Sequence, residues 1–220
     1  LAPGQGTEGG RHTGTFIIEI TDPFAPKAVS FIPVPEGSHN STVHPSGNYF
    51  YNSNSSLIAE QAGLVPGAPG DGDPGIEYYD ISDLDNPVRL GKLILPVMPA
   101  SLGTESHDIT FNEAGDRAYS AALSQGVIID TSDPANPSIL SNWVDPTINV
   151  WHQSDPIVVG EGDDARTLLV VEDEVAGAVG TGQCPNGGVH VFDVTDDPVV
   201  PTKLGSWNID EAREMAADGS

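Results

Sequence analysis

The amino-acid sequence predicts an all-β fold, a β-propeller built of four-stranded blades. One strand-and-turn motif occurs four times, and a hairpin pattern that begins with a histidine precedes three of the four copies. The chain of 220 residues also contains 25 Gly and 19 Pro, a composition that favours short strands joined by tight turns. Repeats of roughly 40–50 residues with four strands each are typical of propeller blades.

Each copy of the motif predicts a strand, a turn and a second strand. A short apolar run ends in an acidic residue, Ser or Thr and then Asp follow, and a proline leads into another extended segment. The copies span residues 16–26, 77–87, 127–137 and 190–201. Because turn side chains of this kind accept hydrogen bonds from backbone amides, we expect five turn acids to be structural: Asp22, Asp83, Asp133, Asp196 and Asp197.

The three hairpins supply the other two strands of a blade. Together with the motif strands they give repeat units of approximately residues 14–35, 39–97, 107–146 and 152–210 within one domain, residues 1–220. The first unit has no hairpin before it, so the chain predicts about three and a half to four blades, which leave sheet edges open. We therefore expect a part of a larger propeller, of about six to eight blades, or a ring closed by a second chain or a missing segment.

The histidines that open the hairpins are the strongest candidates for a chemical site: His39, His107 and His152. The strand after each blade crossover lies innermost in a propeller, so equivalent residues of neighbouring blades converge at one end of the axial channel. Three imidazoles there would suit Cu, Zn or Fe, whereas calcium is less favoured. Three nearby residues are candidates for a supporting role: His44, Glu105 and Asp108.

Two simpler interpretations stay open at these positions. The histidines could cap the inner strands by bonding to neighbouring backbone groups, without any metal. The acidic run at residues 172–174 resembles a cation-binding cluster, but a solvated loop is the simpler interpretation of it.

The charge of the chain excludes several classes of partner. Lys and Arg number 8 against 32 Asp and Glu, which gives a formal net charge of −24. Such a surface repels nucleic-acid phosphates. No apolar run reaches the ~18 residues of a membrane-spanning helix, so we expect no direct membrane insertion. A protein or a glycan is the partner class that we expect.

One copy of the motif resembles a known repeat. The segment Gly126-Val-Ile-Ile-Asp-Thr-Ser-Asp-Pro-Ala-Asn-Pro137 is similar to the repeat of the LVIVD family. The other copies depart from it by Glu19, by Leu84 or by one inserted residue. The resemblance implies a multi-bladed propeller on a bacterial or archaeal surface, and hence an extracellular or cell-surface location. More distantly, the chain resembles selenium-binding-protein and methanethiol-oxidase propellers, which use histidines for metal.

Two functional hypotheses follow from these features. The first is a non-enzymatic extracellular or surface module that binds a protein or glycan through its long connections, residues 57–74 and 175–188. The second is a metal-dependent oxidoreductase or hydrolase that uses the axial histidines as ligands. The metal content of the protein discriminates between the two.

Overall fold

The computed structural model describes residues 14–34, 38–54, 75–96, 105–174, 187–197 and 199–208. Within these ranges the fold is all β, apart from one short 3₁₀ helix, η1 (Gly162–Asp164). No described helix is long and apolar enough to cross a membrane. Most of the two long connections named above lies outside the described residues.

The strands form four antiparallel sheets, and the strands of each sheet follow one another in chain order. The first sheet contains β1 (Gly14–Glu19) and β2 (Lys27–Pro33). The second contains β3 (Asn40–Val43), β4 (Tyr49–Ser53), β5 (Gly75–Asp80) and β6 (Val88–Ile94). The third contains β7 (Asp108–Phe111), β8 (Arg117–Ala121), β9 (Gly126–Asp130) and β10 (Ser138–Trp143). The fourth contains β11 (Trp151–Val159), β12 (Arg166–Asp173), β13 (Gly188–Asp193) and β14 (Thr202–Trp207).

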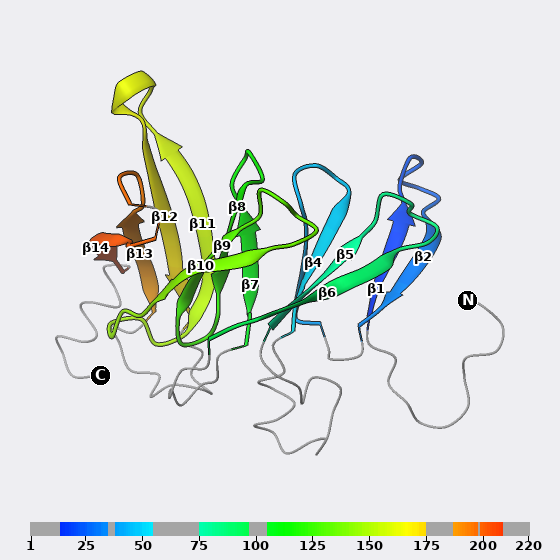
Figure 1. Cartoon of the computed structure of the whole chain (residues 1–220), viewed down its shortest axis with the longest axis horizontal. Coiled ribbons are helices and arrows are strands. Elements are labelled where there is room, and N and C mark those ends of the chain that lie inside the picture. The colour runs from blue at the N-terminus through cyan, green and yellow to red at the C-terminus, as the bar shows by residue number, and fades with distance from the viewer. Residues whose placement is uncertain are drawn as a thin grey trace, which may run out of the picture.

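These sheets are the blades of a propeller. Each four-stranded sheet consists of one predicted hairpin followed by one copy of the motif, and the first sheet consists of the motif alone. Figure 1 shows the four sheets side by side in chain order, with the first and the last at opposite ends of the row. The described residues thus comprise three four-stranded blades and the two outer strands of another.

The two outer strands of every sheet share one irregularity. Their pairing shifts register once, next to Ile17, Tyr78, Ile139 and Val191 in the four sheets. A β-bulge of this kind increases the local right-handed twist of a strand pair. Its repetition in each blade fits outer strands that turn away from the axis.

Apolar side chains fill the spaces between neighbouring blades. One cluster lies between the first and second sheets and includes Ile32 and Phe50. A second cluster, with Tyr51 and Ile129, joins the second sheet to the third. The third cluster joins the last two sheets around Trp151, whose ring meets that of Trp143 edge to face at 5.2 Å. Burial of each large side chain stabilises the stack by about 1.5–3 kcal/mol.

Polar contacts join the inner strands β3, β7 and β11 of neighbouring blades. The Thr42 hydroxyl donates to the Ile109 carbonyl at 2.9 Å. At the equivalent position of the next blade, the Thr110 hydroxyl donates to a carboxylate oxygen of Asp155 at 3.0 Å. Thr42 and Thr110 are each the third residue of their strand, so the two contacts hold the three inner strands at one level.

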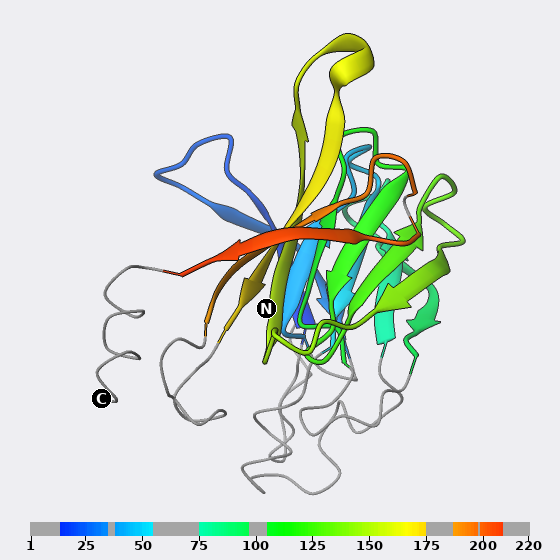
Figure 2. The same cartoon turned by 90° about the vertical axis from the view of Figure 1, so that its left-hand side faces the viewer.

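The last hairpin differs from the other two in length and in register. Strands β11 and β12 extend beyond their neighbours at one end of the molecule, with η1 at the tip (Figures 1 and 2). At the other end the register shifts between Trp151 and Gln153, so His152 is the extra residue of a bulge. His152 therefore lies inside its strand, whereas His39 and His107 precede theirs.

Candidate metal centre

The three predicted histidines lie in a row where the inner strands begin. The backbone amides of His39 and His107 each donate to the carbonyl at the end of the adjacent return strand, at Ser53 and Ala121, both at 2.8 Å. The imidazole ring centroids of His39 and His107 are 3.8 Å apart, and those of His107 and His152 are 4.6 Å apart. Equivalent positions in successive blades thus bring the three rings together.

A chain of hydrogen bonds assigns the tautomer of these imidazoles. Nδ1 of His39 lies 2.9 Å from the His107 carbonyl oxygen, and Nδ1 of His107 lies 3.2 Å from the His152 carbonyl oxygen. Nδ1 of His152 lies 3.0 Å from Oε2 of Glu172. A carbonyl or carboxylate oxygen can only accept a hydrogen bond, so Nδ1 donates in all three rings. In a neutral imidazole this leaves the lone pair on Nε2.

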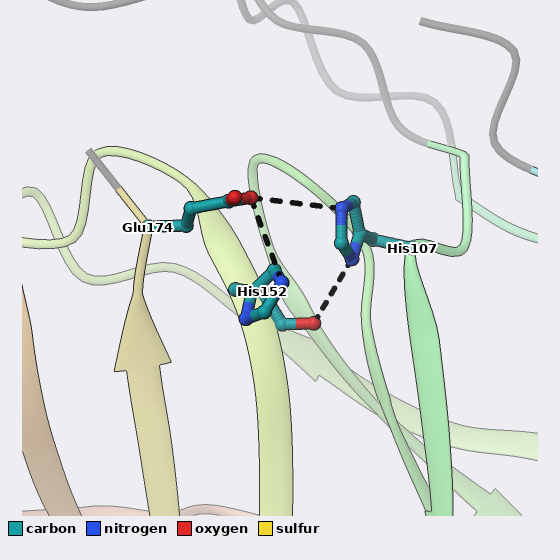
Figure 3. A group of neighbouring side chains, drawn as sticks. All are labelled: His107, His152 and Glu174. Atoms are coloured by element: carbon teal, nitrogen blue, oxygen red, sulfur yellow. Dashed lines mark hydrogen bonds and ion pairs between the residues drawn. The ribbon is translucent and has the colours of Figure 1, made fainter. Parts of the chain in front are cut away.

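Glu174 completes a cluster of ligand atoms with two of the histidines (Figure 3). Its Oε2 lies 3.7 Å from Nε2 of His107 and 3.6 Å from Nε2 of His152. One ligand atom from each of these residues lies within 4.8 Å of the others. His39 packs against the ring of His107 but is not a member of this cluster. We refer to His107, His152 and Glu174 as the axial cluster.

Burial keeps His107 neutral. Its side chain is only 10% exposed, and desolvation, with the neighbouring rings of His39 and His152, lowers the pKa of His107 to about 4. The Glu174 side chain is 45% exposed, so the cluster opens to solvent on the glutamate side. An uncharged imidazole at neutral pH is the form that binds metal ions.

The three residues expected to support the histidines lie in different places. Asp108 is buried beside them, its Oδ1 accepts the Ile109 amide at 2.7 Å, and burial raises its pKa. His44 follows β3 at the end away from His39, and its Nε2 donates to the Gly115 carbonyl at 2.7 Å. Glu105 lies before His107 but contributes no ligand atom to the axial cluster.

The turn acids bond to backbone amides in the way the motif predicts. Oδ1 of each carboxylate accepts the amide two residues later at 3.0–3.1 Å, in four turns: Asp22, Asp83, Asp133 and Asp197. Asp196 lies beside the last of these turns and is exposed. Because each of the four carboxylates already accepts an amide of its own turn, the structure gives no reason to place calcium there.

Sequence reasoning left the acidic run at residues 172–174 as either a cation-binding cluster or a solvated loop, and the structure separates its three residues. Glu172 is the penultimate residue of β12 and Glu174 follows the strand directly; as alternate residues they point to one face, beside His152. Asp173 points the other way, and its Oδ1 accepts the amides of Asn149 and Val150 at 3.0 and 2.9 Å. The sequence contained a signal for this placement. The return strand of a hairpin ends beside the residues that begin the hairpin, and here these include His152.

Comparison with known proteins supports the fold and leaves the chemistry open. No protein-family model matches the sequence, and no curated protein matches it. A solved structure of a Lactobacillus plantarum protein matches with a TM-score of 0.60 at 8% identity, over 87% of this chain and 48% of that one. A hypothetical selenium-binding protein from Sulfolobus tokodaii matches with a TM-score of 0.57 at 9% identity, over 83% and 44%. The periplasmic gluconolactonase of Pseudomonas aeruginosa matches with a TM-score of 0.51 at 10% identity, over 90% and 51%.

These identities are low enough that the likeness shows the propeller fold alone. The chain spans about half the length of the solved structures that it matches.

Proposed function

We propose that this propeller is a metal-dependent enzyme whose ion is held by the axial cluster of His107, His152 and Glu174. The observation that supports the proposal most strongly is the convergence of two imidazole Nε2 atoms on one carboxylate oxygen, at 3.7 and 3.6 Å. Two ligand atoms bound to one tetrahedral zinc ion lie ~3.3–3.4 Å apart. Shifts of a few tenths of an ångström at the glutamate would therefore bring it into ligand geometry with either histidine.

The donor set favours Zn²⁺ or Fe²⁺. Two imidazoles and one carboxylate form a frequent three-ligand set of catalytic zinc sites and of non-haem iron sites, and both kinds keep open positions for substrate. Calcium prefers six to eight oxygen ligands, which this cluster does not offer. A metal-binding histidine usually donates its other ring N–H to an oxygen acceptor, as Nδ1 does here in His107 and His152.

Residues next to the axial cluster would support the reaction by holding a ligand ring in place and by moving a proton. A bound ion of this type polarises a carbonyl oxygen and lowers the pKa of a water molecule. His39 packs on His107 and restricts its ring. Asp108 is buried next to the histidine row, and this burial raises its pKa. A carboxyl group with a raised pKa suits a general acid or base.

Uncharged sugar lactones are the first substrates to test. One protein with this fold, from Pseudomonas aeruginosa, is a gluconolactonase, and lactone hydrolysis needs an activated water and a polarised carbonyl. Four of the described Lys and Arg side chains form ion pairs away from the axial cluster, with these acids: Glu77, Asp130, Asp193 and Asp145. These side chains are therefore not available to bind a phosphate group at the axial cluster, which favours uncharged lactones over phosphorylated ones.

The test compares metal-free and metal-loaded protein on a lactone panel. We expect hydrolysis of neutral lactones to require Zn²⁺ or Fe²⁺ and to fall at least about 100-fold in Glu174→Gln, since a ligand charge is lost. Glu161→Gln, at the exposed tip of the same hairpin, makes the same charge change and should leave the rate unchanged. Hydrolysis that is equal in metal-free protein would contradict the proposal.

The second candidate is a binding module for a protein or glycan, with the extracellular or surface location that an LVIVD propeller would have. The protruding β11–β12 hairpin supports it, because Ile157 and Val159 share one face of β11 and are 41% and 38% exposed. Exposed apolar groups that lie together favour a protein contact. A protein that binds no metal, and in which shortening this hairpin abolishes partner binding, would favour this second function.

A further inference from the structure

The acceptor of the Nδ1 hydrogen changes along the row of histidines. His39 and His107 donate to the backbone carbonyl of the histidine in the next blade, at 2.9 and 3.2 Å. His152 belongs to the last described blade, and a side-chain carboxylate takes the place of that carbonyl: Oε2 of Glu172, at 3.0 Å. In this row of three, the histidine with no following blade among the described residues thus has a carboxylate as its acceptor.

The bulge in β11 makes this contact. Gln153 pairs with Glu172 and Trp151 pairs with Asp173, so His152 is the unpaired residue between them. Its ring lies on the side of Glu172 in β12 and of Glu174 just after β12: Glu172 meets Nδ1, and Glu174 lies 3.6 Å from Nε2. One imidazole thus sits between two carboxylates, and each carboxylate faces a different ring nitrogen.

We infer that Glu172 is a positioning residue of the axial cluster: it accepts the Nδ1 hydrogen of His152 and so keeps Nε2 free for the metal ion. The inference rests on the proposed function for its metal, but the tautomer itself is a property of the metal-free protein. A carboxylate is a stronger acceptor than a carbonyl, and it raises the basicity of the opposite nitrogen. Of the two histidines in the axial cluster, His152 is the less constrained by burial, because its side chain is 31% exposed against 10% for His107.

Loss of the hydrogen bond between Glu172 and His152 should weaken metal binding. Without an acceptor at Nδ1, a half-exposed imidazole can move its hydrogen to Nε2 or rotate into solvent, and the lone pair then no longer faces Glu174. Loss of such an acceptor typically weakens metal binding by about 10–100-fold. Glu172 is itself 53% exposed, so replacing it removes little packing.

Three variants separate positioning from charge. Glu172→Leu removes the acceptor, Glu172→Gln keeps an oxygen acceptor without the charge, and Glu161→Gln removes one charge at the far tip of the hairpin. Thermal unfolding shows whether each variant is folded. We expect the dissociation constant for Zn²⁺ to rise about 10–100-fold in Glu172→Leu, less in Glu172→Gln, and not in Glu161→Gln.

The second readout is the tautomer of His152 in metal-free protein, from its nitrogen-15 chemical shifts. We expect the Nδ1–H form in the unmodified chain and a mixture of forms in Glu172→Leu. An unchanged tautomer in Glu172→Leu would overturn the inference, as would equal Zn²⁺ affinity in the two proteins. If the unmodified chain binds no Zn²⁺, the proposed function fails, and the tautomer readout alone decides whether Glu172 positions His152.

Discussion

At the scale of single residues, the environment of His107 ties burial to chemistry. The same desolvation that keeps its imidazole neutral at pH 7 leaves Nε2 open toward Glu174. A charged imidazole could not bind a metal ion. Burial thus favours the form of His107 that can bind metal. It also makes the stability of the folded protein depend on pH, because acid protonates this buried ring.

The stability of the metal-free protein should depend on the protonation of His107. Its pKa of about 4 in the folded state lies below the ~6.5 of an unfolded histidine. The unfolded chain therefore binds more protons between these values, and stability falls as the pH falls from ~6.5 toward ~4. The slope from one group is at most about 1.4 kcal/mol per pH unit.

Urea unfolding at several pH values measures this contribution. We expect His107→Gln to lose less free energy of unfolding between pH 7 and pH 4.5 than the unmodified chain loses. Parallel pH profiles for the two proteins would show that His107 is not the group responsible.

The turn acids at the same scale are expected to act through hydrogen bonds. Oδ1 of Asp133 accepts the Ala135 amide at 3.1 Å, and Oδ2 accepts from the Asn136 side chain at 3.0 Å. Asp133→Ala removes both bonds and should lower Tm by about 2–4 °C, the shift for a loss of roughly 1 kcal/mol in a domain of this size. Added Ca²⁺ should leave the Tm of both proteins unchanged, and a calcium-dependent rise would instead indicate an ion at the turn.

At the scale of elements, the sequence predicted most of the strands but not how their ends meet. The motif at residues 127–137 gives β9 and β10 because the apolar run, the Ser-Asp turn and the proline each favour one local conformation. The bulge at His152 has no such local signal, since it depends on which residue of β12 pairs with which residue of β11. The hairpin pattern places the acidic run near His152, but only the register shows that Glu174 joins the axial cluster and that Glu172 meets Nδ1 of His152.

The last hairpin offers a matched test of blade packing. Leu169 is fully buried between the last two sheets, whereas Val158 protrudes beyond them on the paired strand. We expect Leu169→Ala to lower the free energy of unfolding by about 2–5 kcal/mol, and Val158→Ala to change it by less than about 0.5 kcal/mol. Denaturant unfolding of both variants checks this, and equal effects would mean that the hairpin does not pack as described.

At the scale of the whole molecule, the fold is clear and the ring is not closed by the described residues. Three four-stranded blades and two outer strands were predictable because the motif repeats. That the ring is completed by a longer chain or a second chain stays a prediction, since the first and last sheets lie apart (Figure 1). Exposed apolar residues on these two sheets, such as Phe16 and Trp207, are consistent with further blades there.

The net charge of −24 also acts on the molecule as a whole. Self-repulsion destabilises a compact acidic protein, and salt screens it. We expect Tm to rise by several degrees when NaCl increases from about 0.05 M to about 1 M, which shortens the Debye length to ~3 Å. Near pH 4, where many carboxylates are protonated, the rise should be smaller, and an equal rise at both pH values would point to a cause other than charge.

The most direct test of the account is a calorimetric titration of metal-free protein with Zn²⁺. The axial cluster predicts one ion for each chain and a dissociation constant that rises at least about 100-fold in His107→Ala and in Glu174→Gln, with no change in Glu161→Gln. Zn²⁺ binding that is absent from the unmodified chain, or equal in all four proteins, would contradict the metal centre.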